Sequence, residues 1–534
     1  MPSATPAPAS PAPDRRRWVA AAVLLVAVFA AYANTLHAPF VYDDTLAIPE
    51  NPTIRRFWPL GDVLLPKVEG GVTVSGRPVL NLSFALNHAI SGVSPWSYHV
   101  TNILIHGGAA LLLFGLVRRT LARIGLAPAA TGERLALAIA ALWALHPLQT
   151  QAITYTVQRA ESLMGFFYLL TLYGFVRGLD AGGEATTRRR WWAASVAACV
   201  LGVGTKEVMA TAPLLVLLYD RTFAAGSFAG ALRARRGYFA ALFASWLVLA
   251  ALLATTGGNR GGTVGLGVGL PLWAYPLTQF QALARYLGLS LWPSPLVFEY
   301  GTFWVKTAGD ILPYAVVVLP LLAATVLALW RRPALGFLGV WFFLILAPTS
   351  LAPGTIQMIV EHRMYLPLAA VVTAVVLGVW RLAGARALGG FGAIALALAA
   401  ATAARNHDYR SNLALWTDTV AKRPLNPRAH QGVAEALEAT GRFDEAIKVR
   451  QESLRLLPDE SHYHYNLALT LAGAGKIDEA VRHYRLALQL FPNEPRTHNN
   501  LAVLLVKQGR NAEALTHYAE AVRLRPGDAQ YHYN

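Results

Sequence analysis

Repeated apolar runs, most of them near the ~20 residues that an α-helix needs to cross a bilayer, dominate the first 404 residues of the chain. Backbone polar groups in lipid must be hydrogen-bonded within their own segment, so these runs predict transmembrane helices. Only 14% of the residues are charged and 55% are hydrophobic, which excludes a soluble globular protein. We expect eleven spans, near residues 18–36, 97–117, 135–153, 161–177, 190–205, 207–220, 237–256, 311–330, 333–349, 364–380 and 388–404.

The basic residues predict how these helices are oriented. Residues 1–17 form a Pro/Ala-rich tail that ends in Arg15-Arg16-Arg17, which is typical of a cytoplasmic tail before a first span. A cleaved signal peptide is the alternative. We favour the retained span, because the apolar stretch is nearer to span length than to the core of a signal peptide. In both cases the loop that follows, residues 37–96, lies outside.

The stretch 273–292 is interrupted by Gln279, Gln281 and Arg285, and we expect an interfacial or re-entrant helix on the outer side there. If that helix does not span, nineteen basic residues fall on the side of the N-terminal tail, which the positive-inside rule assigns to the cytoplasm. They are Arg15 to Arg17, Arg118, Arg119, Arg123, Arg134, Arg177, Arg188, Arg189, Arg190, Arg221, Arg233, Arg235, Arg236, Arg331, Arg332, Arg381 and Arg386. An odd number of spans then places the C-terminus outside.

The overall charge does not indicate nucleic-acid binding, although 46 Lys and Arg stand against 30 Asp and Glu. Residues 426–534 hold 13 basic and 13 acidic residues, so the surplus lies between the apolar runs, where it orients helices. The single cysteine, Cys199, excludes a disulfide within the chain and a Cys-rich metal site.

Residues 426–534 repeat with a period of 34: Gly441, Gly475 and Gly509 are 34 residues apart, as are an alanine and a proline of each unit. This pattern is typical of tetratricopeptide repeats, in which pairs of helices stack into an α-solenoid. We expect three complete units and a partial fourth, behind a linker at residues 405–425. Such an array suits an extended peptide or a partner helix, and a scaffold that dimerises is the alternative.

An acidic pair, Asp43 and Asp44, opens the first outer loop. A carboxylate there can act as general base towards a hydroxyl, and two adjacent carboxylates can also hold a divalent cation such as Mg or Mn. The alternative is a helix N-cap with a solvated neighbour.

Further charged residues lie at the expected outer ends of spans: Arg159, Glu161, Lys206, Glu207, Glu361, His362 and Arg363. Cations at this depth suit a lipid-linked phosphate, and ion pairs that close helix ends are the alternative. Together with the acidic pair they supply what an enzyme needs to use a polyprenyl-phosphate sugar: cations for the leaving phosphate and a base for the acceptor. We expect His99, His106 and His146 to satisfy hydrogen bonds, and we assign no metal ligand.

In their order along the chain, these residues resemble the transmembrane and tetratricopeptide-repeat O-mannosyltransferase family of the GT-C glycosyltransferase superfamily. The resemblance rests on Phe40-Val41-Tyr42-Asp43-Asp44, Arg77-Pro78, Tyr98-His99 to His106, His146-Pro147, Arg159-Ala160-Glu161, Lys206-Glu207, Glu361-His362-Arg363-Met364-Tyr365-Leu366-Pro367 and the repeats. The sequence departs from the family pattern at Gln149 and Gln151, where a His and a Glu would be expected.

The resemblance implies that Asp43 and Asp44 are catalytic, one of them as the base, without saying which. It implies donor-phosphate binding by Lys206, Arg363 and Arg159, with Glu161, Glu207, Glu361 and His362 in support.

The implied protein is all-α, with a GT-C-like transmembrane domain at residues 18–404 and a repeat solenoid behind it. It lies in the cytoplasmic membrane, with its active site and repeats on the periplasmic side. It transfers a sugar, mannose or another hexose, from a polyprenyl-phosphate donor to a hydroxyl of a protein or glycan. The alternative function is a non-catalytic membrane scaffold whose repeats assemble partner proteins.

Overall fold

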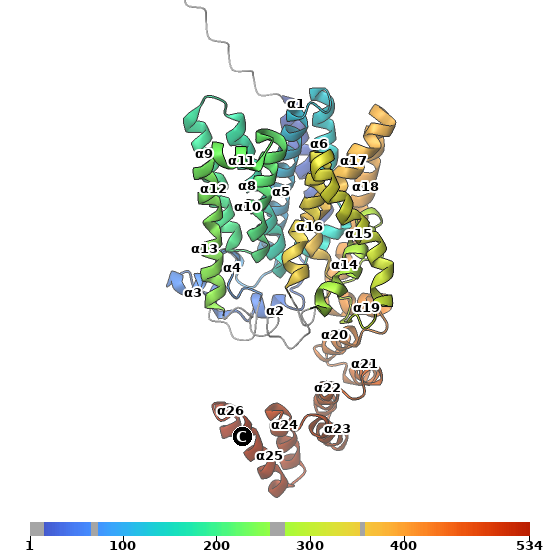
Figure 1. Ribbon diagram of the computed structural model, residues 1–534. Helices are drawn as coiled ribbons and strands as arrows, with labels where there is room; N and C mark the ends of the chain where they lie inside the picture. Colours follow the sequence, from blue (N-terminus) through green and yellow to red (C-terminus); the bar gives the residue numbers. More distant parts are fainter. Residues whose placement is uncertain (1–14, 66–72, 257–272, 353–357) are drawn as a thin grey trace, which may run out of the picture. The chain divides into compact units, whose positions relative to one another are not determined.

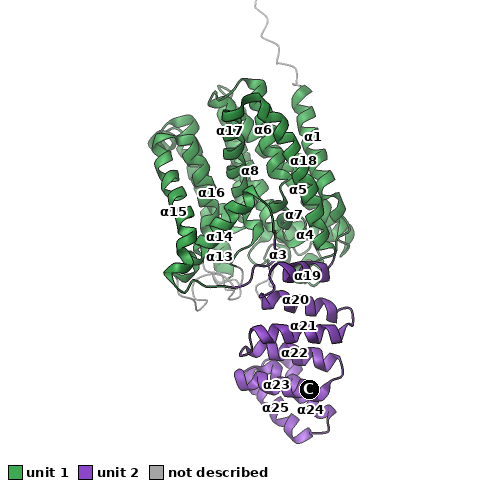
Figure 2. Ribbon diagram, turned by 90° about the vertical axis from the view of Figure 1, so that its right-hand side faces the viewer, with its two compact units in different colours: residues 1–296, 303–410 green, residues 297–302, 411–534 purple. Residues whose placement is uncertain are grey.

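The computed structural model describes residues 15–65, 73–256, 273–352 and 358–534, and within these ranges the chain is helical with no β-strand. The expected all-α class is confirmed. Residues 1–14 of the expected cytoplasmic tail lie outside the described residues. The chain forms two compact units (Figure 2): unit 1 comprises residues 1–296 and 303–410, and unit 2 comprises residues 297–302 and 411–534.

Unit 1 is a bundle of long apolar helices, and each expected span is largely helical in it (Figure 1). Its helices are α1 (Arg15–Tyr32), α2 (Asp44–Ala47), α3 (Leu60–Leu64), α4 (Pro78–Ser91), α5 (Trp96–Arg123), α6 (Ala129–Ala144), α7 (Thr150–Ile153), α8 (Arg159–Asp180), α9 (Ala185–Val203), α10 (Ala212–Asp220), α11 (Phe228–Ala234), α12 (Arg236–Phe243), α13 (Ser245–Thr255), α14 (Ala274–Leu291), α15 (Ala308–Arg331), α16 (Pro333–Leu351), α17 (Pro367–Ala383) and α18 (Ala387–Asn406).

Eight helical stretches in the described ranges are long and apolar enough to cross a membrane, or nine if the bent pair Ala129–Ala144 and Pro147–Ile153 is one span. The eleven expected spans include two more than these nine. One is α9, which begins among arginines and is not one of the eight, and the other arises because α17 and α18 count here as one stretch. The helix expected not to span, α14, is not one of the eight either. The chain is therefore a multi-pass membrane protein, and the number eleven stays a prediction.

Ion pairs gather basic residues of several helices at one end of unit 1. Arg119 and Arg123 of α5 both pair with Asp180 at the end of α8, and Arg17 of α1 pairs with Glu133 of α6. The helices of the first loop, α2 and α3, lie at the opposite end of the bundle (Figure 1). These basic residues and the acidic pair are thus separated by the length of the bundle, as the expected orientation requires.

Tyr365 anchors the segment that precedes α17. Its hydroxyl lies 2.9 Å from His106 Nδ1, and its carbonyl accepts a hydrogen bond of 2.7 Å from Trp143 Nε1. The ring lies against α8 at Gly165, where an added Cβ would overlap it. Helices α5, α6 and α8 together therefore fix this segment in place.

Unit 2 is built of paired helices in the period that the sequence predicts. The three complete pairs are α20 (Pro427–Glu438) with α21 (Phe443–Leu456), α22 (Ser461–Gly473) with α23 (Ile477–Leu490), and α24 (Pro495–Lys507) with α25 (Asn511–Leu524), and α26 (Ala529–Tyr533) begins a fourth. Gly441, Gly475 and Gly509 have φ of 75°, 77° and 74°, the left-handed conformation that ends the first helix of each pair.

The stretch expected to be a linker, residues 405–425, is mostly helical. Helix α18 runs to Asn406, and α19 spans Asn412–Lys422. Helix α19 packs on the first repeat because the ring of Trp416 fills the space that the missing side chain of Gly432 leaves. Unit 2 also includes residues 297–302, whose buried Glu299 accepts a 2.8 Å hydrogen bond from Asn426 Nδ2.

We predict that Gly165→Val lowers the stability of the protein by about 1–3 kcal/mol, because the added carbons force the Tyr365 ring off α8. The measurement is the temperature at which detergent-solubilised protein stops eluting as a folded species. The matched control is Gly390→Val in α18, where a Cβ meets nothing within 4 Å. Equal unfolding temperatures for the two variants would contradict the packing described here.

Candidate active site

The acidic pair lies at a strained point of the backbone. Tyr42, directly before Asp43, has φ of 49° and is the one non-glycine residue with positive φ in the described ranges. Such conformations cost about 1–3 kcal/mol and gather at functional sites, where the surrounding structure enforces them. Here the backbone N–H of Asp43 donates to the Tyr155 hydroxyl at 3.1 Å, and the strained turn is thereby held.

The two carboxylates of the pair have different surroundings. Asp44 is fully buried, and its oxygens accept hydrogen bonds from the backbone N–H groups of Val41 at 3.0 Å and Val157 at 2.6 Å. Burial raises the pKa of Asp44 to about 7, although these hydrogen bonds lower it. Asp43 is only partly buried. Asp44 therefore holds the loop in place, whereas Asp43 is the more accessible carboxylate of the pair.

The acid pair does not fit the divalent cation, Mg or Mn, that the sequence suggested. Both oxygens of Asp44 already accept backbone hydrogen bonds. The described part of the chain contains no group of three or more His, Cys, Asp or Glu side chains arranged to hold a metal ion. His106 bonds to Tyr365 and Ala144, His99 bonds to the Ala38 carbonyl, and His146 accepts from the backbone of Leu148.

Arg159 is buried and hydrogen-bonded to several groups of the protein, so its guanidinium is not exposed to a ligand. Its guanidinium donates to Asn102 Oδ1 at 2.6 Å, to Asn87 Oδ1 at 2.7 Å, to Ser83 and to the carbonyl of Tyr98. It also lies over the Phe84 ring, 4.6 Å from the centroid, and its exposed fraction is 0%. The structure thus differs from the expectation that Arg159 faces the donor phosphate: it binds α4 and α5 to the start of α8.

Cationic side chains surround Glu161 of α8, which is buried. Lys206 Nζ makes an ion pair with Glu161, and Arg363 and Glu161 line one small crevice with a cavity volume of about 10 Å³. The pKa of Lys206 is lowered to about 8 by burial and by the nearby Arg77 and Arg363, although Glu161 raises it. We call Lys206, Arg363, Arg77 and Glu161 the cation cluster.

Arg77 is the member of the cation cluster that the sequence did not single out as a site residue. Its guanidinium donates to Glu207 at 3.3 Å and to the Thr73 carbonyl at 3.0 Å, and its exposed fraction is 6%. The sequence did point to Arg77, because Arg77-Pro78 is one of the segments on which the family resemblance rests. A buried arginine before a helix start is unusual enough to be a candidate.

His362 borders the cation cluster as a neutral side chain. Its pKa is lowered well below the usual range by burial and by Lys206, Arg363 and Arg77. Both its backbone N–H and its Nδ1 bond to Gln151 Oε1, at 2.9 and 3.0 Å, so Nδ1 carries the proton. Its Nε2 lies 4.0 Å from Glu161 Oε1. Gln151, which stands where the family pattern has an acid, thus positions His362. The neighbouring Glu361 is buried.

The start of α8 connects the acidic pair to the cation cluster. Val157, which donates to Asp44, is four residues before Glu161, and Tyr155, which accepts from Asp43, is two residues before Val157. The base candidate and the candidate phosphate site are therefore both attached to one short stretch of backbone. This arrangement links a carboxylate and a group of cations through the start of α8, and these are the kinds of group that general-base catalysis and stabilisation of developing negative charge require.

Comparisons with known proteins identify the repeats and the relatives of the chain. A family model described as Tetratricopeptide repeat matches residues 382–461 and 463–529, and the first match begins within α17 of unit 1. The protein O-mannosyl-transferase Tmtc1 of Drosophila melanogaster is 35% identical over 203 residues, which are 36% of this chain and 21% of the fly protein. The human protein O-mannosyl-transferase TMTC2 is 33% identical over 199 residues, which are 36% of this chain and 22% of the human protein.

Among solved structures, ArnT from Cupriavidus metallidurans bound to undecaprenyl phosphate aligns over 91% of this chain and 81% of that chain, with 16% identity and a TM-score of 0.42. The matched part of the chain spans only about a fifth of the fly and human relatives. Within the part that these matches cover, the chain is similar to protein O-mannosyl-transferases of fly and human, and its C-terminal residues are tetratricopeptide repeats.

Proposed function

We propose that the protein is a membrane glycosyltransferase of the GT-C type, which transfers mannose or another hexose from a polyprenyl-phosphate donor to a hydroxyl of a protein or glycan. The observation that supports this most is the arrangement around the start of α8. A reachable carboxylate, Asp43, and the cation cluster are held there by the same stretch of backbone. The names of the relatives agree with this function.

The reaction is a single displacement at the anomeric carbon of the sugar. The acceptor hydroxyl gives its proton to a carboxylate oxygen of Asp43 while its oxygen forms the bond to the anomeric carbon. The bond between that carbon and the phosphate oxygen breaks, and its electron pair leaves with the polyprenyl phosphate. Attack and departure occur on opposite faces, so the configuration of the sugar inverts.

The cation cluster stabilises the phosphate as its leaving oxygen gains negative charge. Lys206 acts as a compact charge, and Arg363 and Arg77 act as planar donors, in surroundings where water does not screen them. Glu161 keeps these like charges together while no phosphate is bound. Because neighbouring cations lower the pKa of Lys206, an arriving anion relieves their repulsion, and the cluster is thus prepared for a phosphate.

We further propose that the acidic pair and the cation cluster face the periplasm of a cytoplasmic membrane, and that the repeats of unit 2 bind the acceptor protein. The separation of the acidic pair from the paired arginines of α5 supports this orientation.

We predict that Asp43→Asn reduces transfer of labelled mannose from polyprenyl-phosphate mannose to periplasmic protein by at least about 100-fold, because a general base contributes roughly 10²–10⁴ in rate. Its thermal stability stays near that of the unmodified protein. The control is Asp62→Asn, which changes an exposed carboxylate of the same loop. Transfer by Asp43→Asn at the rate of the control would overturn the assignment of the base.

We predict that Asp44→Asn instead lowers the stability by about 1–3 kcal/mol, because its amide NH₂ opposes the N–H of Val41 or Val157. Sugar transfer by Asp44→Asn falls as the loop unfolds, and part of the transfer activity remains at temperatures well below the unfolding temperature of the variant. The measurement pairs the transfer assay with thermal unfolding of the same sample. An inactive Asp44→Asn protein of unchanged stability would show that Asp44 reacts directly.

We predict that kcat/KM falls as pH rises through about 8, because Lys206 loses its charge there. In Lys206→Arg the guanidinium stays charged, so this alkaline decline moves to higher pH. Lys422→Arg in α19, whose lysine pairs with Asp418, is the matched control and keeps the original profile. The same alkaline decline in Lys206→Arg and in the control would show that Lys206 does not titrate in the reaction.

A further inference from the structure

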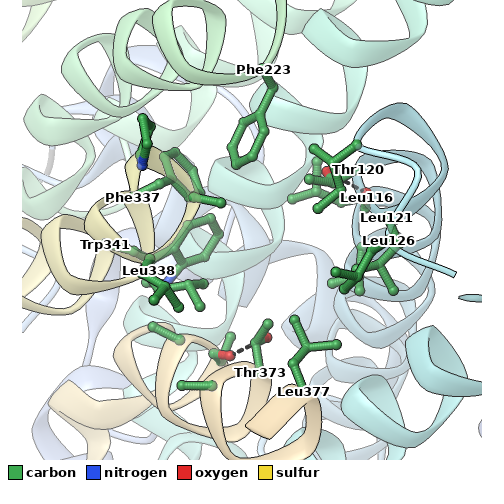
Figure 3. Close-up of a pocket in the computed structure, with 18 of the residues that line it drawn as sticks. Leu116, Thr120, Leu121, Leu126, Phe223, Phe337, Leu338, Trp341, Thr373 and Leu377 are labelled. Atoms are coloured by element: carbon green, nitrogen blue, oxygen red, sulfur yellow. Dashed lines mark hydrogen bonds between the residues drawn. The ribbon is translucent and has the colours of Figure 1, made fainter. Parts of the chain in front are cut away.

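A cavity of about 510 Å³ lies inside unit 1 between α5, α10, α16 and α17, apart from the site described above (Figure 3). Its size falls in the range of ~300–1,000 Å³ that is common for ligand pockets. Figure 3 shows Leu116 and Leu121 of α5 facing Phe337 and Trp341 of α16 across the open space, with Leu377 of α17 beside them. The walls are thus apolar.

The hydroxyl groups that border the cavity already have partners. Thr120 Oγ1 lies 2.8 Å from the Tyr219 hydroxyl, and Thr373 Oγ1 donates to the Ala369 carbonyl at 2.6 Å. An occupant of the interior therefore gains no hydrogen bond from these two threonines, and an apolar chain suits the space best.

The cavity opens to the outer surface of the bundle. Leu335, Ala374 and Gly378 line it and are all exposed. In a multi-pass membrane unit, a surface between α16 and α17 meets lipid. The opening can therefore admit a lipid chain directly from the bilayer.

Two arginines line the same cavity near its opening. Arg332 precedes α16 and Arg381 lies near the end of α17, and both are exposed. Neither has a carboxylate partner among the described residues, whereas Arg119 and Arg123 of α5 share Asp180. Basic pockets between transmembrane helices on the cytoplasmic side are suited to anionic lipid head groups.

The cavity is distinct from the cation cluster. The apolar part of the cavity comes within about one helical turn of the crevice beside Glu161, at Trp341 and Ile345 of α16. The arginines lie at the other end of the cavity, where Arg332 is 13 residues from Ile345 and Arg381 is 14 residues from Pro367 of the crevice, about 20 Å of helix in each case. An anion bound by them is therefore not the donor phosphate of the proposed reaction.

We propose that this cavity binds an anionic glycerophospholipid, with an acyl chain between α5, α16 and α17 and the phosphate between Arg332 and Arg381. The lipid comes from the leaflet on the side of the N-terminal tail. It is a structural lipid and not a substrate, so its binding does not depend on the transferase activity.

The test is native mass spectrometry of the full chain, purified in detergent with phosphatidylglycerol or phosphatidylcholine added in turn. We expect phosphatidylglycerol to remain bound preferentially. Each arginine near the membrane surface contributes roughly fivefold in affinity, so Arg332→Gln with Arg381→Gln weakens binding roughly 25-fold. The matched control is Arg189→Gln with Arg190→Gln, which removes the same charge from exposed arginines of α9 outside the cavity.

A second variant tests the cavity without changing its charge. Gly378→Phe is accommodated, because a Cβ there meets nothing within 4 Å, and its ring blocks the opening. Phosphatidylglycerol binding falls in this variant and not in Gly390→Phe, which is equally open but lies on α18. The proposal would be overturned if the Arg332/Arg381 variant and the Arg189/Arg190 control retained phosphatidylglycerol equally. It would also be overturned if the unmodified protein retained phosphatidylcholine as well as phosphatidylglycerol, or if polyprenyl phosphate displaced the bound phosphatidylglycerol.

Discussion

One buried carboxylate holds the first loop of unit 1 against the segment before α8, the helix that carries Glu161 of the cation cluster. Asp44 accepts hydrogen bonds from Val41 in its own loop and from Val157, 113 residues later, directly before α8. Burial makes the charged form costly, which is why its pKa rises to about 7, and the two N–H groups offset part of that cost. Together with the hydrogen bond from the Asp43 N–H to the Tyr155 hydroxyl, this link fixes the turn at Tyr42 next to the segment before α8.

Two arginines at the same end of the molecule show how surroundings decide the use of a charge. Arg159 has carbonyl, amide and hydroxyl partners from α4 and α5, and an aromatic ring lies against one face of its guanidinium. Its guanidinium therefore stabilises the packing of these helices. Arg363 donates to the Tyr275 hydroxyl and the Met358 carbonyl at 3.4 Å, and it borders a crevice with Glu161. Displacing the contacts of Arg159 would leave several buried polar groups without partners, which is why we propose Arg363 and not Arg159 for the phosphate.

The local patterns predicted the architecture well, because apolar length and a fixed period are local properties. The positions of the helices and of Gly441, Gly475 and Gly509 follow from such patterns. The roles of single charges do not, since the partners of Arg159 come from Ser83, Asn87 and Asn102, far away in the sequence. The helix α19 was missed for the same reason: its fit depends on Trp416 meeting Gly432.

The proposed reaction requires that the cation cluster receives the phosphate while Asp43 acts only on the acceptor. The most direct measurement is equilibrium binding of polyprenyl phosphate, the leaving group of the reaction, to the purified full chain in nanodiscs. We expect Lys206→Gln to weaken this binding by more than about tenfold, in keeping with the ~1.5–3 kcal/mol of a charge-assisted contact, and Asp43→Asn to bind like the unmodified protein. Equal binding by Lys206→Gln, or a comparable loss in Asp43→Asn, would contradict this division of roles.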